Sequence, residues 1–229
     1  MSSIPEFWVV VPAAGGGRRM GMGVPKQYLS LCGRAVIEHA LQPFLARSEC
    51  RGVVVAIASD DPHWSGLGIA KDSRVRTVTG GAERIDSVRS GVQALPAQPT
   101  DWVLVHDAAR PCLRDEDLVR LLETLRNDEV GGLLAAPVVD TLKRADANER
   151  VAATVDRAAL WHALTPQMFR HEILLRALQS AVTGTDESQA VEALGLKPKL
   201  VRGSAENIKI TVAEDLARAE RILRSRSKT

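Results

Sequence analysis

Short apolar runs alternate with helical patterns along this chain. Four runs are rich in β-branched residues and nearly continuous in hydrophobicity: Phe7–Val11, Val53–Ala58, Val75–Thr79 and Trp102–His106. Such runs are typical of strands whose two faces are both covered, as in a parallel sheet. The pattern therefore predicts a sheet of mainly parallel strands.

Apolar residues at helical spacing predict helices between these strands. One helix is expected over Val36–Leu45, although Pro43 should kink or shorten it. A second follows the three acids that begin at Asp115, where the helix dipole favours negative charge. The last helix should begin at a capping box formed by Thr211 and Glu214. Strand–helix alternation of this kind predicts a doubly wound α/β fold.

The alternation breaks between Asp140 and Thr165. Two short extended segments, Thr141–Arg144 and Val151–Val155, lie on either side of a polar turn. This arrangement predicts a β-hairpin arm, at about residues 138–160, that projects from the rest of the molecule.

The remainder of the chain extends the same domain. Residues Phe169–Leu194 are expected to be helical, and Lys199–Val201 should return to the sheet. No internal repeat or low-complexity linker interrupts the sequence, and 229 residues with 45% apolar content can bury a sizeable core. We therefore expect a single domain over residues 1–229.

Charge and composition argue against several function classes. Basic and acidic residues number 30 and 28 and are well mixed, which predicts neither a nucleic-acid nor a membrane partner. Cys32, Cys50 and Cys112 are too irregularly spaced for a disulfide framework, and the apolar run near the N-terminus is too short for a signal peptide. A soluble, cytoplasmic protein is expected.

The most informative motif is a glycine-rich loop, Pro12–Met20, followed by Pro25-Lys26-Gln27. It comes directly after the first strand, at the edge where doubly wound sheets bind ligands. Its glycines allow backbone N–H groups to approach an anion, and Arg18, Arg19 and Lys26 add positive charge with no acid among them. The spacing fits neither a Walker A loop nor a dinucleotide fingerprint. An ordinary strand-to-helix turn is the alternative to a polyphosphate site.

The pattern Pro-Ala-Ala-Gly-x-Gly-x-Arg-Met, followed by Pro-Lys-Gln, resembles the signature of the 2-C-methyl-D-erythritol 4-phosphate cytidylyltransferases of the non-mevalonate isoprenoid pathway. Other segments agree with that family in the same order, and together they cover almost the whole chain. They are Gly80-Gly81-x-x-Arg84-x-x-Ser87-Val88, His106-Asp107-Ala108-Ala109-Arg110-Pro111, Asp140-Thr141-Leu142-Lys143, Thr154-Val155-Asp156-Arg157, Leu160–Gln167 and Asn207–Thr211.

This resemblance implies a fold and a reaction. The fold would be a Rossmann-like nucleotidyltransferase with a doubly wound, mostly parallel sheet and a projecting hairpin arm. The enzyme would transfer CMP from CTP to 2-C-methyl-D-erythritol 4-phosphate by in-line attack of the substrate phosphate on the α-phosphorus. The products would be 4-diphosphocytidyl-2-C-methyl-D-erythritol and pyrophosphate. The resemblance also implies Mg²⁺ or another divalent cation, and a homodimer in which each arm crosses to the partner subunit.

The resemblance also assigns residues to roles. The CTP-binding set is Ala13, Ala14, Gly15, Gly17, Arg19, Lys26, Gly81, Ser87 and Ala108. The substrate-binding set is Asp107, Arg110, Thr141, Arg157, Thr165 and Lys209. The catalytic residues would be Arg19, Lys26, Arg157 and Lys209, and Asp107 is also the candidate metal ligand.

Each of these residue types also has an ordinary structural interpretation. Asp107 could form a turn, and Ser87 could cap a helix. Lys209 lies between two isoleucines and would face solvent in a simple strand, while Thr141 and Arg157 could be surface residues of the arm. These alternatives remain open from the sequence.

Rival functions also remain open. The nearest is a ribitol-5-phosphate-type cytidylyltransferase, whose loop tends to begin Leu-Ala-Gly-Gly. Another sugar-phosphate nucleotidyltransferase or a non-catalytic nucleotide-binding regulator is more distant.

Two positions depart from the family pattern. Gly16 adds a third glycine to the loop, and Ala82 replaces a residue that can be polar in relatives, which puts a side-chain contact there in doubt.

Overall fold

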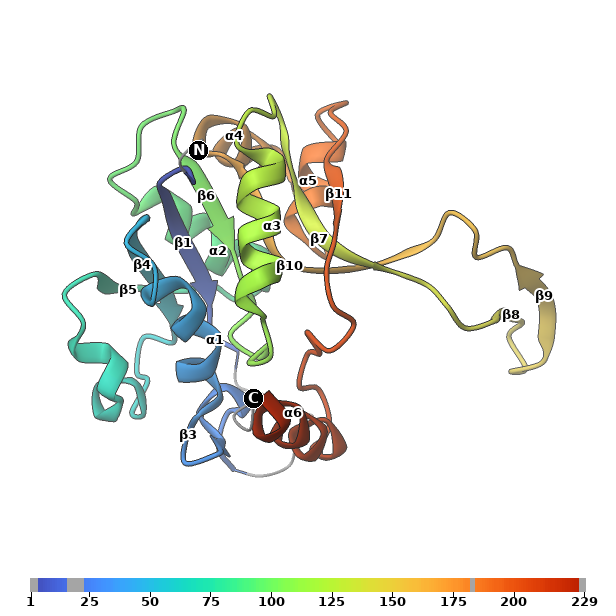
Figure 1. Ribbon diagram of the computed structural model, residues 1–229, viewed down its shortest axis with the longest axis horizontal. Coiled ribbons are helices and arrows are strands. Elements are labelled where there is room, and N and C mark those ends of the chain that lie inside the picture. Colours follow the sequence, from blue (N-terminus) through green and yellow to red (C-terminus); the bar gives the residue numbers. More distant parts are fainter. Residues whose placement is uncertain (1–3, 16–22, 182–183, 227–229) are drawn as a thin grey trace.

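The computed structural model describes residues 4–15, 23–181 and 184–226. Within them, seven strands form one sheet in the order β11-β7-β10-β6-β1-β4-β5 (Figure 1). These strands are β1 (Phe7–Pro12), β4 (Cys50–Ile57), β5 (Val75–Thr79), β6 (Trp102–Val105), β7 (Gly131–Pro137), β10 (Trp161–Arg170) and β11 (Lys199–Arg202). Only β10 runs antiparallel to its neighbours in this described sheet. The expected mostly parallel sheet is confirmed.

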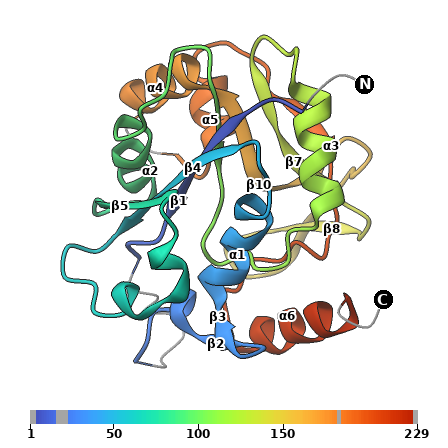
Figure 2. The same cartoon turned by 60° about the vertical axis from the view of Figure 1, so that its left-hand side comes forward.

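Helices cover both faces of the sheet (Figure 2). They are α1 (Val36–Leu45), α2 (Arg84–Gln93), α3 (Asp115–Leu125), α4 (His171–Ser180), α5 (Glu187–Glu192) and α6 (Ala213–Arg226). Successive residues of β1 alternate between the two cores: Val9 and Val11 join the cluster with α1 and α3, whereas Val10 joins the cluster with α2, α4 and α5. This two-sided burial explains why the strand is apolar at every position.

Shorter elements surround the sheet. The 3₁₀ turns η2 (Lys26–Tyr28), η3 (Trp64–Gly66) and η4 (Gly68–Lys71) and the strands β2 (Ser30–Leu31) and β3 (Arg34–Ala35) complete the main body. Helix α6 packs against β2 through a small separate cluster that includes Leu31 and Ala219. None of the helices in the described part of the chain is long and apolar enough to cross a membrane.

The hairpin arm leaves the body where β7 ends and returns at the start of β10 (Figure 1). Its strands β8 (Leu142–Ala145) and β9 (Val151–Val155) pair only with each other among the described strands. Almost every residue of the pair is exposed, including Val151 at 67%. Two strands with so little buried surface are marginal on their own.

Several details differ from the expectations. Strands β7 and β10 were not anticipated, because β7 is built of Gly, Leu and Ala and β10 contains Pro166. The expected helical region from Phe169 begins instead at His171 and contains two helices, since Phe169 still pairs within the sheet.

Two predicted helix ends also need correction. Helix α1 continues through Pro43 to Leu45, because the missing N–H affects only its last turn. At the start of α6, the backbone N–H groups of Thr211 and Val212 donate to Asp215, not to Glu214. The helix begins at Ala213, so Asp215 is the acid that faces back toward them.

Candidate active site

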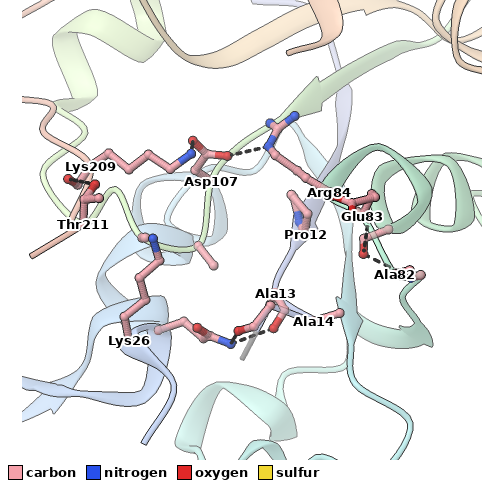
Figure 3. A pocket seen from close by; sticks show the side chains of 16 residues that line it. Pro12, Ala13, Ala14, Lys26, Ala82, Glu83, Arg84, Asp107, Lys209 and Thr211 are labelled. Carbon is pink, nitrogen blue, oxygen red and sulfur yellow. Dashed lines mark hydrogen bonds and ion pairs between the residues drawn. The ribbon is translucent and has the colours of Figure 1, made fainter. Parts of the chain in front are cut away.

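A pocket of about 300 Å³ lies at the carboxyl ends of β1, β5 and β6 (Figure 3). Three chain segments that follow these strands form most of its wall, and the segment before α6 closes it. Its lining residues in the described part of the chain are Pro12, Ala13, Ala14, Gly15, Lys26, Gln27, Gly81, Ala82, Glu83, Arg84, Ser87, Asp107, Ala108, Ala109, Lys209 and Thr211. The position agrees with the rule for ligand sites in doubly wound sheets.

The beginning of the glycine-rich loop is held by Gln27. Its side-chain amide donates to the carbonyl oxygens of Ala13 at 2.7 Å and Gly15 at 3.1 Å. The neighbouring Lys26 lines the pocket, so the Pro-Lys-Gln motif supplies both a brace and a cation. The predicted residues Gly17 and Arg19 lie outside the described residues.

The second junction requires its glycines. A Cβ on Gly80 would lie 2.5 Å from the Cβ of Ala14, and one on Gly81 would lie 2.2 Å from the Cβ of Asp86. The Ser87 hydroxyl accepts a hydrogen bond from the N–H of Gly81 at 3.1 Å and donates to the carbonyl of Glu83 at 3.3 Å. The helix-capping alternative for Ser87 is wrong, because α2 already begins at Arg84. Ser87 instead fixes the turn that shapes this wall of the pocket.

Asp107 is the electrostatic centre of the pocket (Figure 3). Its carboxylate contacts Arg84 Nε at 3.0 Å, Lys209 Nζ at 3.0 Å and Arg110 Nε at 3.3 Å. Burial alone would raise the pKa of Asp107, but the charges of Arg84, Lys209 and Arg110 outweigh it and hold that pKa well below its usual range. Asp107 therefore stays ionised and fixes the positions of the cations around it.

The contacts decide between the ionic and the ordinary structural interpretations of Asp107 and Lys209. The carbonyl of Asp107 does accept the N–H of Arg110 in a turn, but the side chain has the separate ionic role. Lys209 is 40% exposed and points at Asp107 within the pocket, so it is not a purely solvent-facing side chain. Arg110 lies behind the pocket wall, where it also donates to the carbonyl of Asn207 at 2.7 Å.

The buried residues His106 and Thr165 form a hydrogen-bonded chain that ends on the backbone of Asp107. The Thr165 hydroxyl accepts the N–H of Asp107 at 3.1 Å and donates to His106 Nδ1 at 3.0 Å. This arrangement leaves the proton of His106 on Nε2, which donates to the carbonyl of Arg110 at 3.1 Å. Complete burial lowers the pKa of His106 to about 4. Thr165 was expected among the substrate ligands, but it is buried behind the pocket lining.

The free energy of unfolding should depend less on pH below pH 7 in His106→Gln than in wild type. The pKa of folded His106 is about 4, below its ordinary value of 6.5, so the unfolded chain binds more protons between these pH values. The free energy of unfolding should fall by up to about 3 kcal/mol as the pH drops through this window. Urea unfolding of wild type and variant at pH 7, 6, 5 and 4.5 measures the difference. Parallel curves for the two proteins would contradict the buried, neutral imidazole.

Thr141 and Arg157 are not brought to this pocket. Both lie on the arm and are exposed, and Arg157 donates to the carbonyl of Val139 at the base of the arm. Neither belongs to the pocket lining, and Figure 1 shows the arm directed away from the body. Within one subunit, the arm residues therefore cannot complete the site.

Sequence reasoning missed several residues of the pocket. Gln27 and Arg84 belonged to motifs already recognised, but no site role was assigned to them. Glu83 and Thr211 also line the pocket. Glu187, which pairs with Arg84, had no recognisable signal because it lies 103 positions away.

The described residues contain no group of three or more His, Cys, Asp or Glu side chains that could hold a metal. Asp107 and Glu83 are the carboxylates that line the pocket in the described part of the chain, and both Asp107 oxygens already contact cations. Such a donor set fits a divalent cation that is bound mainly by a polyphosphate, with at most one carboxylate from the protein.

Comparisons with known proteins agree with this geometry. The family model for IspD, 2-C-methyl-D-erythritol 4-phosphate cytidylyltransferase, matches residues 7–225. A relative of that name from Pseudomonas aeruginosa is 55% identical over 227 residues, which are 96% of this chain and 97% of the relative. One from Pseudomonas putida is 54% identical over 223 residues, or 94% and 95% of the two chains.

Solved structures of lower sequence identity share the fold. A crystal structure of 4-diphosphocytidyl-2C-methyl-D-erythritol synthase has a TM-score of 0.84 at 39% identity, and covers 96% of this chain and 99% of its own. The 2-C-methyl-D-erythritol 4-phosphate cytidylyltransferase of Thermus thermophilus has a TM-score of 0.80 at 33% identity, with the same coverage of 96% and 99%. The chain therefore belongs to the 2-C-methyl-D-erythritol 4-phosphate cytidylyltransferase family.

Proposed function

We propose that this enzyme transfers CMP from CTP to 2-C-methyl-D-erythritol 4-phosphate and releases pyrophosphate. Membership of the cytidylyltransferase family supports the reaction. The observation that carries it in this chain is the fixed ionic cluster around Asp107, at the same sheet edge as the start of the glycine-rich loop and Lys26. A pocket with preplaced cations suits the meeting of two phosphorylated substrates.

The chemistry is an in-line displacement at the α-phosphorus of CTP. The attacking phosphate oxygen is already an anion, so the step needs no general base. The difficulty is to bring two anions together and to stabilise the charge that grows on the leaving pyrophosphate. Lys26 and Arg19 are assigned to the triphosphate, and Lys209 is assigned to the attacking phosphate. The small residues Ala13, Ala14, Gly15 and Gly81 allow the nucleotide to approach the backbone closely.

A divalent cation fits this proposal. Mg²⁺ bound to the triphosphate would neutralise charge on the leaving group. Of the two described carboxylates that line the pocket, Asp107 is assigned to contribute an oxygen to it, directly or through water. Ser87 and Ala108 are assigned to the nucleoside half of CTP, because both line the same pocket as Gly81.

We further propose a homodimer with two shared sites. The whole chain, 1–229, would act as one catalytic domain, and the arm at about 138–160 would cross to the partner. Arg157 and Thr141 would then reach the acceptor phosphate beside the partner's pocket. The exposure of the arm and its distance from its own pocket lining support this arrangement. The free thiols of Cys32, Cys50 and Cys112 are consistent with the cytoplasmic setting that we expect.

The acceptor is tested by comparing two acceptors in separate reactions. With CTP and Mg²⁺, kcat/KM for methylerythritol phosphate should exceed that for ribitol 5-phosphate at least about tenfold, which corresponds to about 1.4 kcal/mol in transition-state binding. Pyrophosphate release is measured for each acceptor, and ATP, GTP and UTP replace CTP in parallel reactions. A preference for ribitol 5-phosphate would assign the enzyme to the rival activity, and equal use of all four nucleotides would contradict specificity for CTP.

A further inference from the structure

Arg84 lines the pocket, but its guanidinium is held by a residue that does not. Glu187, on helix α5, is only 1% exposed. Its two carboxylate oxygens accept from Arg84 Nη1 at 2.6 Å and Nη2 at 3.2 Å. This is a bidentate pair, in which two parallel bonds fix both the place and the orientation of the guanidinium.

The third nitrogen of the same guanidinium reaches the centre of the pocket. Arg84 Nε donates to Asp107 at 3.0 Å, as Figure 3 shows. Arg84 therefore bridges two carboxylates, one buried at the first residue of helix α5 and one that lines the pocket. Lys209 contacts the same Asp107 from the other side at 3.0 Å. Arg84 and Lys209 therefore share one carboxylate, Arg84 through Oδ1 and Lys209 through Oδ2.

The position of Glu187 is itself fixed against the sheet. Gln167 of strand β10 accepts the N–H of Ser188 at 2.8 Å and donates to Asp186 at 3.0 Å. Gln167 is 1% exposed, and the bond that it accepts from Ser188 is buried. The buried Glu187 carboxylate also cannot leave Arg84 without becoming an unpaired charge in the interior, which is strongly unfavourable. The base of this chain of contacts is thus rigid.

We propose that Glu187 is a positioning residue of the active site, which acts on the substrates through Arg84 and Asp107. The inference rests on the proposed function, because it concerns the same pocket. Without the charge of Glu187, Nη1 and Nη2 of Arg84 are no longer held, and the guanidinium can rotate to place them on Asp107. Arg84 then competes with Lys209 for that carboxylate, and Lys209 no longer meets the acceptor phosphate in its proper place.

Glu187→Gln tests this idea, with Glu192→Gln as the matched control. Both changes replace a glutamate on α5, but Glu192 is exposed at the far end of the helix. Glu187→Gln should raise the KM for methylerythritol phosphate at least about fivefold and lower kcat/KM at least about tenfold. Glu192→Gln should remain within twofold of wild type. If apparent kcat falls while the KM for methylerythritol phosphate and the KM for CTP stay unchanged, the variant has only lost folded protein. That result would overturn the proposal.

A second variant decides the matter if Glu187→Gln does not fold. Arg84→Met combined with Glu187→Leu replaces the buried pair by apolar side chains of similar size, a change that proteins often tolerate. This protein should keep a Tm close to that of wild type, yet its kcat/KM should be at least about 20-fold lower. A folded double variant within threefold of wild type would show that the pair serves stability alone.

The proposed function is separated from this inference by the wild-type assay. If wild type releases pyrophosphate with another acceptor phosphate and not with methylerythritol phosphate, the proposed function fails. The same comparison of KM values, made with the acceptor that works, then still supports or overturns the role of Glu187.

Discussion

Lys26→Ala is expected to lower kcat at least about 100-fold while the protein remains folded. Lys26 lines the pocket beside the start of the glycine-rich loop, whose backbone is braced by Gln27. A cation held there can stabilise charge that increases in the transition state, and such contacts typically contribute about 2.7–4 kcal/mol. Because other groups are also assigned to the ground-state triphosphate, the loss should fall on kcat more than on the KM for CTP.

The measurement is steady-state pyrophosphate release at saturating CTP and acceptor, with circular dichroism to verify folding. Lys71→Ala is the matched control, because Lys71 is an exposed lysine outside the pocket and should retain normal kcat. Arg19→Ala should resemble Lys26→Ala if both cations act on the triphosphate. Near-normal kcat in a folded Lys26→Ala enzyme would refute the role assigned to that lysine.

Two inactive variants should restore activity when their subunits are mixed. If each site combines the loop of one chain with the arm of its partner, a dimer of one Lys26→Ala and one Arg157→Ala subunit has one intact site and one doubly altered site. Random exchange makes half of the dimers mixed, so activity should recover to about a quarter of the wild-type value. The expectation follows because Arg157 lies on an arm that projects from the body and does not line the pocket of its own subunit.

The control mixes Lys26→Ala subunits with subunits that carry both Lys26→Ala and Arg157→Ala. No dimer in that mixture has an intact loop, so no activity should return. Differently tagged subunits verify that exchange has taken place. If exchange is complete and the first mixture stays inactive, Arg157 acts within its own chain and the shared site is wrong.

The parts of the fold that were predictable are those whose signal is local. Strand β1 is a continuous apolar run, and helix α3 buries leucines at helical spacing, so the local pattern alone identified both. Strands β7 and β10 lack that signal. The Gly131–Pro137 strand has poor β-propensity, and it forms because β10 and β11 pair with it on both sides. Gly132 is needed there, since a Cβ would lie 2.1 Å from the Lys199 carbonyl oxygen.

By itself, the sequence determined which motifs would meet at one edge of the sheet. The apolar strands end at Pro12, Thr79 and Val105, and polar or glycine-rich motifs follow each of them directly. Because the carboxyl ends of parallel strands share one edge of a sheet, those motifs had to meet. Only the tertiary structure decided which charges pair. Asp107 is shared by three cations, and Arg84 is held by Glu187 from a helix 103 positions away. Ion-pair partners depend on which elements pack together, and no local spacing encodes that contact.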